Sequence, residues 1–309
     1  MRIAIMGSGG LGGFYGGRLA QNGNEVNFIA RGKHLSHIQR HGIKLIGPEE
    51  IISLDKVVAT EDPSEIGFVD VILFCVKLYD VEAAANLIKP IVSQDTIIVS
   101  VLNGINGPDR LFKSLNKGVV FGGSARVSAR ISNPGVITFL GQNKDHKLTF
   151  GHPDCRKPQN AIEFCNICNR AKIPTQITNE IEVELWDKLV QLTCVAGLTT
   201  LSRKPIGFAM KDRHLFEMGK KILREVEAVA RAKNIKLAAN IFETKINLIC
   251  SFPDGLYASM YHDLILGRRI EVEDIFGYLS QEGRAVSVPT PVIDMIYAFL
   301  KPHISGQCL

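Results

Sequence analysis

The sequence lacks a hydrophobic run long enough to cross a membrane. Its longest uncharged apolar segment, residues 189–201, falls short of the ~18 residues that a spanning helix needs and is interrupted by Gln191 and threonines. We therefore expect this segment to be a buried helix. The first residues are apolar but dense in glycine, which is untypical of a signal peptide, so the expected location is the cytoplasm.

Aromatic side chains and long runs of one charge are also scarce. The 309 residues include one tryptophan, and the basic residues are spread along the chain rather than gathered in one run. The formal net charge of +5 is mild. A nucleic-acid surface usually combines clustered basic residues with stacking aromatics. The composition therefore favours a small anionic ligand, with no nucleic-acid or membrane partner.

Paired cysteines are few. The chain has seven cysteines, an odd number, so a disulfide framework is not expected. Cys165 and Cys168 form one C-x-x-C, and His152 and Cys155 lie nearby, but no second C-x-x-C occurs. Structural zinc would need two more ligands at a compatible spacing. We expect reduced thiols on a helix, and no metal.

The order of apolar segments indicates two domains. Up to about residue 102, short apolar runs alternate with helical patterns, and the continuous run 69–76 is typical of a parallel strand buried on both faces. After about residue 175 only long helical patterns remain. We expect an α/β Rossmann-type domain with a doubly wound parallel sheet at residues 1–178, and an all-α domain at residues 179–309. The expected strands are 2–6, 25–30, 69–76 and 96–102, and the expected helices are 10–22, 33–41, 80–89, 180–202, 212–234, 239–250, 257–266, 271–284 and 290–301.

A glycine-rich turn follows the first expected strand. Gly7, Gly9 and Gly12 form G-x-G-x-x-G between that strand and the first helix, the context in which this motif binds a dinucleotide. The glycines allow a tight turn, close approach of a pyrophosphate, and close packing of helix on strand. The helix N-terminus adds N–H groups for the phosphates. The candidate phosphate-binding residues are Gly7, Ser8, Gly9, Gly10, Leu11 and Gly12.

The end of the second expected strand indicates which dinucleotide binds. An NAD site places an acidic residue there for the ribose 2′-hydroxyl. This chain instead has Arg31, followed by Lys33 and His34. A guanidinium matches a 2′-phosphate, to which it can donate two hydrogen bonds. The expected cofactor is therefore NADP(H); the alternative is that Arg31 is a solvated surface arginine.

Three further positions place a polar side chain where a ligand is expected. Lys77 and Asn103 follow expected strands, at the carboxyl edge where open α/β sheets bind ligands. Lys188 opens the apolar helix 189–201, and partial desolvation there suits acid–base chemistry. Each has a structural alternative, which is a loop hydrogen bond for Lys77 and Asn103 and an ordinary helix-end lysine for Lys188.

Taken together, these segments resemble the ketopantoate reductases (2-dehydropantoate 2-reductases), NADPH-dependent enzymes of the 6-phosphogluconate-dehydrogenase-like group. The resemblance extends over essentially the whole chain. The matching segments are the glycine motif with Arg31, Val76-Lys77, Leu102-Asn103-Gly104, Trp186-Asp187-Lys188-Leu189, the polar run from Ser259-Met260 through Asp263 and Gly267-Arg268 to Glu271, and Val288-Pro289-Thr290-Pro291. On sequence alone, Asp263 and Arg268 need be no more than an ion pair.

The resemblance implies a role for each matching residue. The glycine turn, Arg31, Lys77 and Asn103 would bind NADPH, with Asn103 at the junction with the substrate. Lys188 would be the general acid, and Glu271 would hold the substrate or orient the lysine, so these two form the catalytic set. Ser259 would contact the substrate carboxylate. The implied substrate-binding residues are Asn103, Lys188, Ser259 and Glu271, in a cleft between the domains.

One pair of positions departs from the family pattern. The family's helix carries asparagines four and eight residues after the lysine, where this chain has Leu192 and Ala196. The resemblance implies NADPH-dependent reduction of 2-dehydropantoate to pantoate in pantothenate biosynthesis. Losing two amides puts that substrate in question, though not 2-oxo acid reduction. The alternatives are reduction of another branched 2-oxo acid and a non-catalytic NADP(H) sensor. A homodimer is compatible with the resemblance, and the sequence does not fix the oligomeric state.

Overall fold

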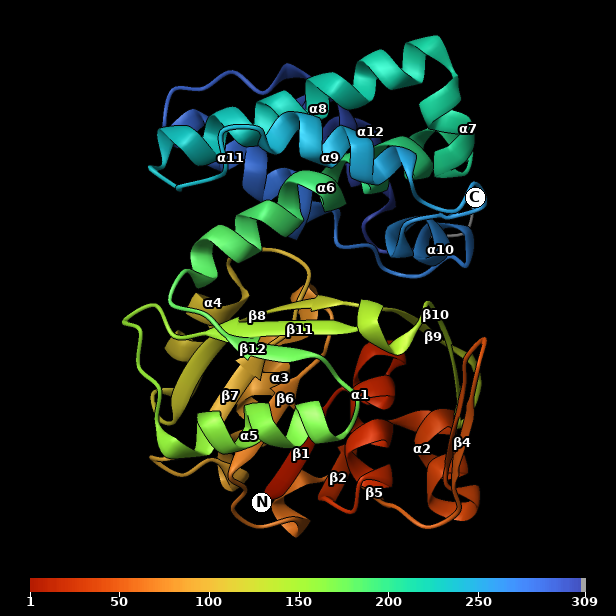
Figure 1. Ribbon diagram of the computed structural model, residues 1–309, viewed down its shortest axis with the longest axis vertical. Helices are drawn as coiled ribbons and strands as arrows, with labels where there is room; N and C mark the ends of the chain where they lie inside the picture. The colour runs from red at the N-terminus through yellow and green to blue at the C-terminus, as the bar shows by residue number, and fades with distance from the viewer. Residues whose placement is uncertain (307–309) are drawn as a thin grey trace. The chain divides into compact units, whose positions relative to one another are not determined.

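The structure is a computed structural model that describes residues 1–306, and the chain separates into two compact units. Unit 1 comprises Met1–Leu102 and Asn106–Ile181, whereas unit 2 comprises Asn103–Ile105 and the chain from Glu182 onward. Unit 1 is α/β and unit 2 is all-helical (Figure 1). This confirms the expected fold class. The short segment Asn103–Ile105, which follows a strand of unit 1 in the chain, is grouped with the helices of unit 2.

Unit 1 is built around a mostly parallel sheet. Within residues 1–306 its eight strands are ordered β12-β11-β8-β7-β6-β1-β2-β5, and β8 with β11 forms the antiparallel pair. The strand β6 reads VILF and is buried throughout, as a parallel strand covered on both faces should be. The strands are β1 (Arg2–Met6), β2 (Glu25–Ile29), β5 (Val58–Thr60), β6 (Val71–Phe74), β7 (Ile97–Ser100), β8 (Val119–Arg126), β11 (Lys147–Gly151) and β12 (Thr175–Ile177).

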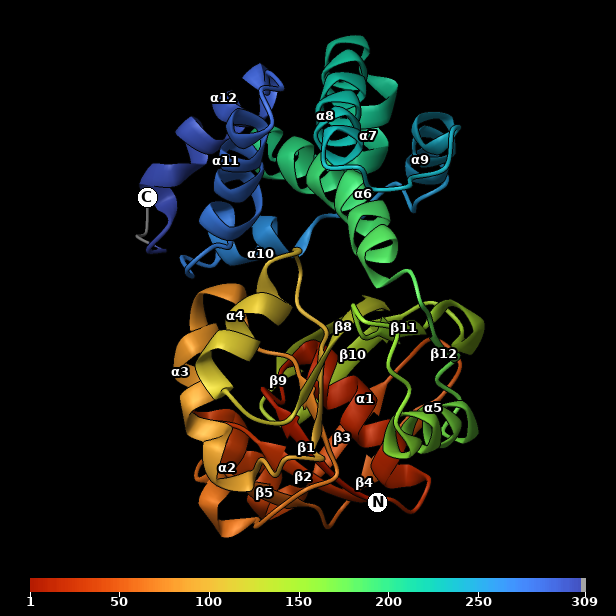
Figure 2. The same cartoon turned by 90° about the vertical axis from the view of Figure 1, so that its left-hand side faces the viewer.

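Helices cover both faces of this sheet. Figure 2 shows α3 and α4 on one side and α1 and α5 on the other. The helix α1 links the parallel neighbours β1 and β2, so the glycine turn lies at the carboxyl end of β1. The helices of unit 1 are α1 (Gly10–Gln21), α2 (Gly32–His41), α3 (Val81–Ile88), α4 (Gly107–Leu115) and α5 (Gln159–Arg170).

A smaller four-stranded sheet, which the sequence does not predict, packs against α1. Its order is β4-β3-β10-β9 within the described residues. These strands are short and partly exposed, so none forms the continuous apolar run that marks β6. The parallel pair of β3 and β10 joins distant parts of the chain, with Lys44 opposite Val136. The strands are β3 (Ile43–Ile46), β4 (Ile51–Leu54), β9 (Ser128–Asn133) and β10 (Val136–Leu140).

Unit 2 consists of helices, as expected, with two differences of detail. The expected helix 271–284 is divided into a π-helical turn, Glu273–Gly277, and α11, and the short helix α7 was not expected. The helix α8 packs against α7, α9, α11 and α12 (Figure 1). In the described part of the chain, no helix is both long and apolar enough to cross a membrane. The helices are α6 (Ile181–Ser202), α7 (Ile206–Lys211), α8 (Arg213–Ala232), α9 (Ile241–Cys250), α10 (Ser259–Ile265), α11 (Tyr278–Ala285) and α12 (Pro291–Leu300).

Candidate functional site

The glycine turn between β1 and α1 is tightly packed on two sides. A Cβ added at Gly12 would lie 2.2 Å from the carbonyl oxygen of Gly7. Gly7 itself has φ of +89°, and a Cβ added there would lie 2.9 Å from Cγ1 of Val76. Both positions therefore require glycine. The buried Ser8 donates its hydroxyl to the carbonyl of Ile29 at 3.1 Å, which ties the turn to the end of β2.

The third side of the turn is open. A Cβ added at Gly9 would meet no heavy atom of the described residues within 4 Å. Gly9 is also the N-cap of α1, where no side chain caps the helix and no acidic residue occupies the first turn. The N–H groups at this end of α1 and the positive end of its dipole are thus available to an anion. This geometry fits the pyrophosphate of a dinucleotide, as the motif predicts.

His34 connects this turn to the smaller sheet, a role that the sequence did not indicate. Its Nδ1 accepts the N–H of Gly135 at 3.0 Å, so Nε2 carries the proton and donates to the carbonyl of Ser8 at 2.8 Å. Gly135 lies in the turn between β9 and β10. The neutral imidazole therefore holds the backbone of the glycine turn in place.

Acid should weaken nucleotide binding through His34. Burial is the largest cause that lowers the pKa of His34 from 6.5, and the nearby His37 lowers it further. The neutral ring and its two hydrogen bonds are present above that lowered pKa and are lost as the pH falls through it, because protonated Nδ1 can no longer accept. We expect NADPH affinity, measured by fluorescence titration, to fall more steeply with acid in wild type than in His34→Gln. Parallel pH profiles for the two proteins would contradict this role.

Arg31 lies at the N-cap of α2, directly after β2, as expected. Its side chain is 86% exposed and donates to Asp80 Oδ2 at 3.2 Å. An exposed pair of this kind contributes about 0–1 kcal/mol, so a phosphate can displace the carboxylate. Asp80 ends the short 3-10 turn that begins after Lys77, and no pattern in the sequence predicts its place beside Arg31.

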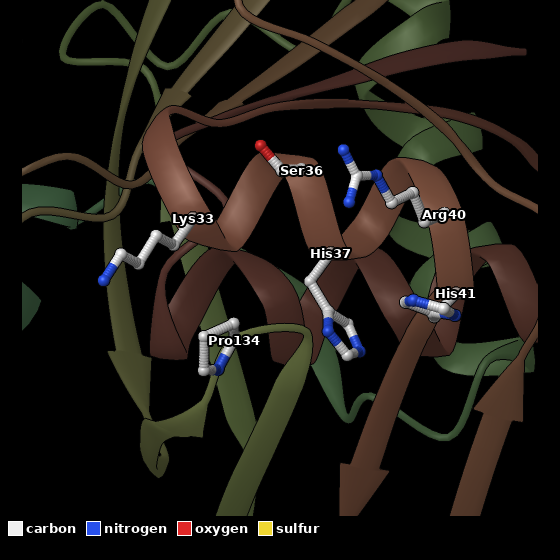
Figure 3. Close-up of a pocket in the computed structure, with 6 residues that line it drawn as sticks. All are labelled: Lys33, Ser36, His37, Arg40, His41 and Pro134. Carbon is white, nitrogen blue, oxygen red and sulfur yellow. The ribbon is translucent and has the colours of Figure 1, made fainter.

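A basic hollow lies along α2 beyond Arg31. It has a volume of about 370 Å³ and no acidic side chain lines it. Figure 3 shows Lys33 extending from the first turn of the helix and His37 next to Pro134 of the β9–β10 turn. The positive groups around this helix favour a cofactor that carries an additional phosphate. The lining residues are Lys33, Ser36, His37, Arg40, His41 and Pro134.

Lys77 and Asn103 both follow strands of the large sheet. Lys77 is half-buried and comes three residues after β6, and Asn103 is half-buried and comes three residues after β7. The strands β6 and β7 are parallel neighbours, with Phe74 opposite Ser100. Both residues thus occupy the carboxyl edge of the sheet that the sequence predicts for them.

Lys188 and Asn103 meet within unit 2. The Nζ of Lys188 donates to Oδ1 of Asn103 at 3.2 Å, although 85 residues separate them in the sequence. Lys188 is half-buried near the start of α6, between the buried side chains of Trp186 and Leu189. The amide oxygen of Asn103 holds the Lys188 ammonium in one position. This contact is the strongest geometric evidence for a reactive centre at Lys188.

The polar run after residue 258 belongs to the same unit. Ser259 is the first residue of α10 and is exposed, and Glu271 is 3% exposed two residues before the π-helical turn. Turns of this type often occur at functional sites. Asp263 and Arg268 form an ion pair at 3.9 Å, the structural alternative that the sequence left open for them.

Thr199 supports this run from α6, and its position could not be read from the sequence. It is fully buried, donates its hydroxyl to Val195, and accepts the N–H of Ala258 at 3.3 Å. Ala258 is the N-cap of α10. The helix that carries Lys188 therefore also anchors the start of the helix that carries Ser259.

The cysteines of the C-x-x-C lie on α5, as expected. Cys165 is half-buried, Cys168 is buried, and burial raises the pKa of both thiols, which disfavours a reactive thiolate. Within residues 1–306, no three His, Cys, Asp or Glu side chains gather closely enough to hold a metal ion.

Comparisons with known proteins give the family. The family model "Ketopantoate reductase PanE/ApbA" matches residues 3–154, and "Ketopantoate reductase PanE/ApbA C terminal" matches residues 180–303. The chain therefore belongs to the ketopantoate reductase family, and the resemblance that the sequence suggested is confirmed. Similar proteins bear the names of oxidoreductases, which supports an oxidoreductase as the class of enzyme.

Individual relatives are similar over nearly their full length but at low identity. The chain is 25% identical to the uncharacterized oxidoreductase YkpB of Bacillus subtilis (98% of this chain, 99% of that one). It is 26% identical to a 2-dehydropantoate 2-reductase of Lactococcus lactis (96% of each). A crystal structure of a PanE/ApbA family ketopantoate reductase from Ralstonia eutropha superposes with a TM-score of 0.90 at 27% identity and covers 98% of both chains.

Proposed function

We propose that this protein uses NADPH to reduce the ketone of a small branched 2-oxo acid, either 2-dehydropantoate (ketopantoate) or an unhydroxylated acid of similar size. The observation that carries the proposal is the hydrogen bond from Lys188 to Asn103 at 3.2 Å. It gives the proposed general acid a fixed acceptor within the same unit. A protein that only sensed NADP(H) would need no oriented lysine of this kind.

NADPH would supply the hydride for the ketone carbon. The open side of the turn at Gly9 and the uncapped start of α1 would bind its pyrophosphate, and Arg31 would bind its 2′-phosphate. The amide of Asn103 would orient the Lys188 ammonium. That ammonium would stabilise negative charge on the ketone oxygen and donate the proton. The remaining proposed roles are substrate contact by Ser259, orientation of substrate or lysine by Glu271, and cofactor contact by Lys77.

Turnover distinguishes this proposal from a sensor. Purified protein is mixed with NADPH and each member of a panel of 2-oxo acids, and the loss of NADPH absorbance is followed. Reduction of any branched 2-oxo acid with formation of the 2-hydroxy acid supports the enzyme. Tight NADPH binding, shown by fluorescence, without turnover on the whole panel would refute it and favour the sensor.

The face of α6 that follows Lys188 is apolar. Leu192 is half-buried and Ala196 is 3% exposed, at one and two turns beyond the lysine. The neighbouring Thr193 is fully buried and donates its hydroxyl to the carbonyl of Leu189 at 2.7 Å, so its proton is already used within the helix. This face therefore favours an apolar branch of the substrate over a hydroxylated one.

We predict that wild type prefers 2-oxoisovalerate, which lacks the hydroxymethyl group, to ketopantoate. A buried hydroxyl without a partner costs about 1–3 kcal/mol, whereas a buried methylene contributes about 0.8 kcal/mol. The double change Leu192→Asn with Ala196→Asn should shift the ratio of kcat/KM values toward ketopantoate by roughly tenfold. The measurement is kcat/KM for both acids at one NADPH concentration. A strong wild-type preference for ketopantoate would show that another group supplies the hydrogen bond.

A further inference from the structure

A buried lysine lies one residue from the proposed general acid. Lys245, on α9, is 2% exposed, and its Nζ donates to Oδ2 of Asp187 at 2.6 Å. Asp187 immediately precedes Lys188 on α6. A buried ammonium is strongly disfavoured unless it is paired and hydrogen-bonded. A hydrophobic side chain at position 245 would fill this space without that penalty, so the charge requires an explanation.

The pair controls where the Asp187 carboxylate points. Asp187 and Lys188 leave the helix about 100° apart on the same turn, so an unrestrained carboxylate would compete with Asn103 for the Lys188 ammonium. In the structure, Lys245 donates to that carboxylate from α9, while Lys188 donates to Asn103. The positive charge of Lys245 thus offsets the negative charge of Asp187 next to Lys188.

We propose that Lys245 is a positioning residue for Lys188, which pairs with the adjacent carboxylate and so fixes the turn of α6 from which Lys188 extends. This inference rests on the proposed function of Lys188. All four side chains concerned lie in unit 2, and Asp187 and Lys188 follow the fully buried Trp186. Asp187, which pairs with Lys245, and the proposed acid Lys188 are therefore neighbours on one packed turn of α6.

The charges near this turn give the proposal a distinctive signature. On α6 they are Glu184, one turn before Lys188, and Asp187, and Lys245 comes from α9. Asp187 and Lys245 together carry no net charge. Removal of the lysine therefore leaves one uncompensated negative charge beside Lys188, whereas removal of the carboxylate leaves a buried lysine that favours its neutral form.

The test compares Lys245→Met, Asp187→Asn and the double variant. Lys245→Met should move the loss of kcat/KM at alkaline pH upward by roughly one pH unit, the order expected when a compensating positive charge is removed close to an ammonium at an effective dielectric constant of about 20. Asp187→Asn leaves a buried lysine without its carboxylate, which favours the neutral amine, so its profile should stay near that of wild type. The double variant, neutral at both positions, should return toward the wild-type profile. Lys211→Met, which breaks the exposed pair with Asp254 in the same unit, is the matched control and should leave the profile unchanged.

A second measurement does not depend on turnover. The full-length protein is labelled at lysine Cε, the Lys188 signal is assigned by its loss in Lys188→Ala, and its titration is followed by NMR in each variant. An upward shift in Lys245→Met that the double variant reverses supports the proposal. A downward shift, or lowered thermal stability with unchanged titration, would overturn it and leave Lys245 a structural residue. An inactive wild type in which Lys245→Met nevertheless shifts the titration upward would refute the proposed function alone. If Lys245→Met does not fold, Lys245→Gln, which removes the charge and keeps a hydrogen-bond donor, takes its place.

Discussion

Lys188→Ala should lower kcat by about 100-fold or more, the usual scale for loss of a general acid. The ammonium that donates to Asn103 at 3.2 Å is the group proposed to stabilise and protonate the ketone oxygen. The dissociation constant of NADPH should change little, because the glycine turn belongs to unit 1 and Lys188 to unit 2. Steady-state kinetics with the best 2-oxo acid gives kcat, and fluorescence titration gives the dissociation constant.

A matched variant separates this effect from a general loss of lysine charge. Lys211 is an exposed lysine of the same unit, paired with Asp254 at 2.7 Å, and Lys211→Ala should keep wild-type kcat. A Lys188→Ala protein with near-normal kcat would return Lys188 to the role of an ordinary helix-end lysine. A protein that loses NADPH affinity and kcat together would indicate misfolding, which circular dichroism would detect.

The strands and helices around the glycine turn could be predicted because their burial requires a recognisable pattern of apolar residues in the sequence. The strand β6 is apolar throughout, since helices cover both of its faces, and glycine or proline residues bound the neighbouring helices. The smaller sheet could not be predicted in the same way. The strand β9 is largely exposed and reads SARISN, so its pairing with β10 leaves no apolar pattern. Its position depends on packing against α1.

The individual candidate residues could be named from the sequence, but their mutual contacts could not. A resemblance selects Lys188 and Asn103, yet only the folded chain brings together residues that are 85 positions apart. The pairing of Lys245 with Asp187, 58 positions apart, has no local sequence signal at all. The cofactor NADP(H), the domain boundary and the homodimer stay predictions, and so do the roles of all the site residues: the glycine turn, Arg31, Lys77, Asn103, Lys188, Ser259 and Glu271.

Arg31→Ala should raise the KM for NADPH by roughly 10–100-fold, the effect of losing a charge-assisted contact worth about 1.5–3 kcal/mol. The KM for NADH should change little, because NADH has no 2′-phosphate for the guanidinium. Arg31 is 86% exposed at the N-cap of α2, so its replacement should not disturb the fold. The measurement is kcat/KM for both cofactors in wild type and variant, at one fixed concentration of the 2-oxo acid.

Asp80 provides the control, because it is the carboxylate that pairs with Arg31 at 3.2 Å. If Arg31 binds the 2′-phosphate, Asp80 competes with that phosphate for the guanidinium and repels it. Asp80→Asn should then leave the KM for NADPH unchanged or lower it. The opposite pattern would identify an NADH enzyme: Asp80→Asn would raise the KM for NADH, as expected when a carboxylate accepts a ribose hydroxyl, and Arg31→Ala would leave the KM for NADPH unchanged. Measuring the KM for NADPH and for NADH in both variants therefore shows which of the two residues contacts the 2′-position of the ribose.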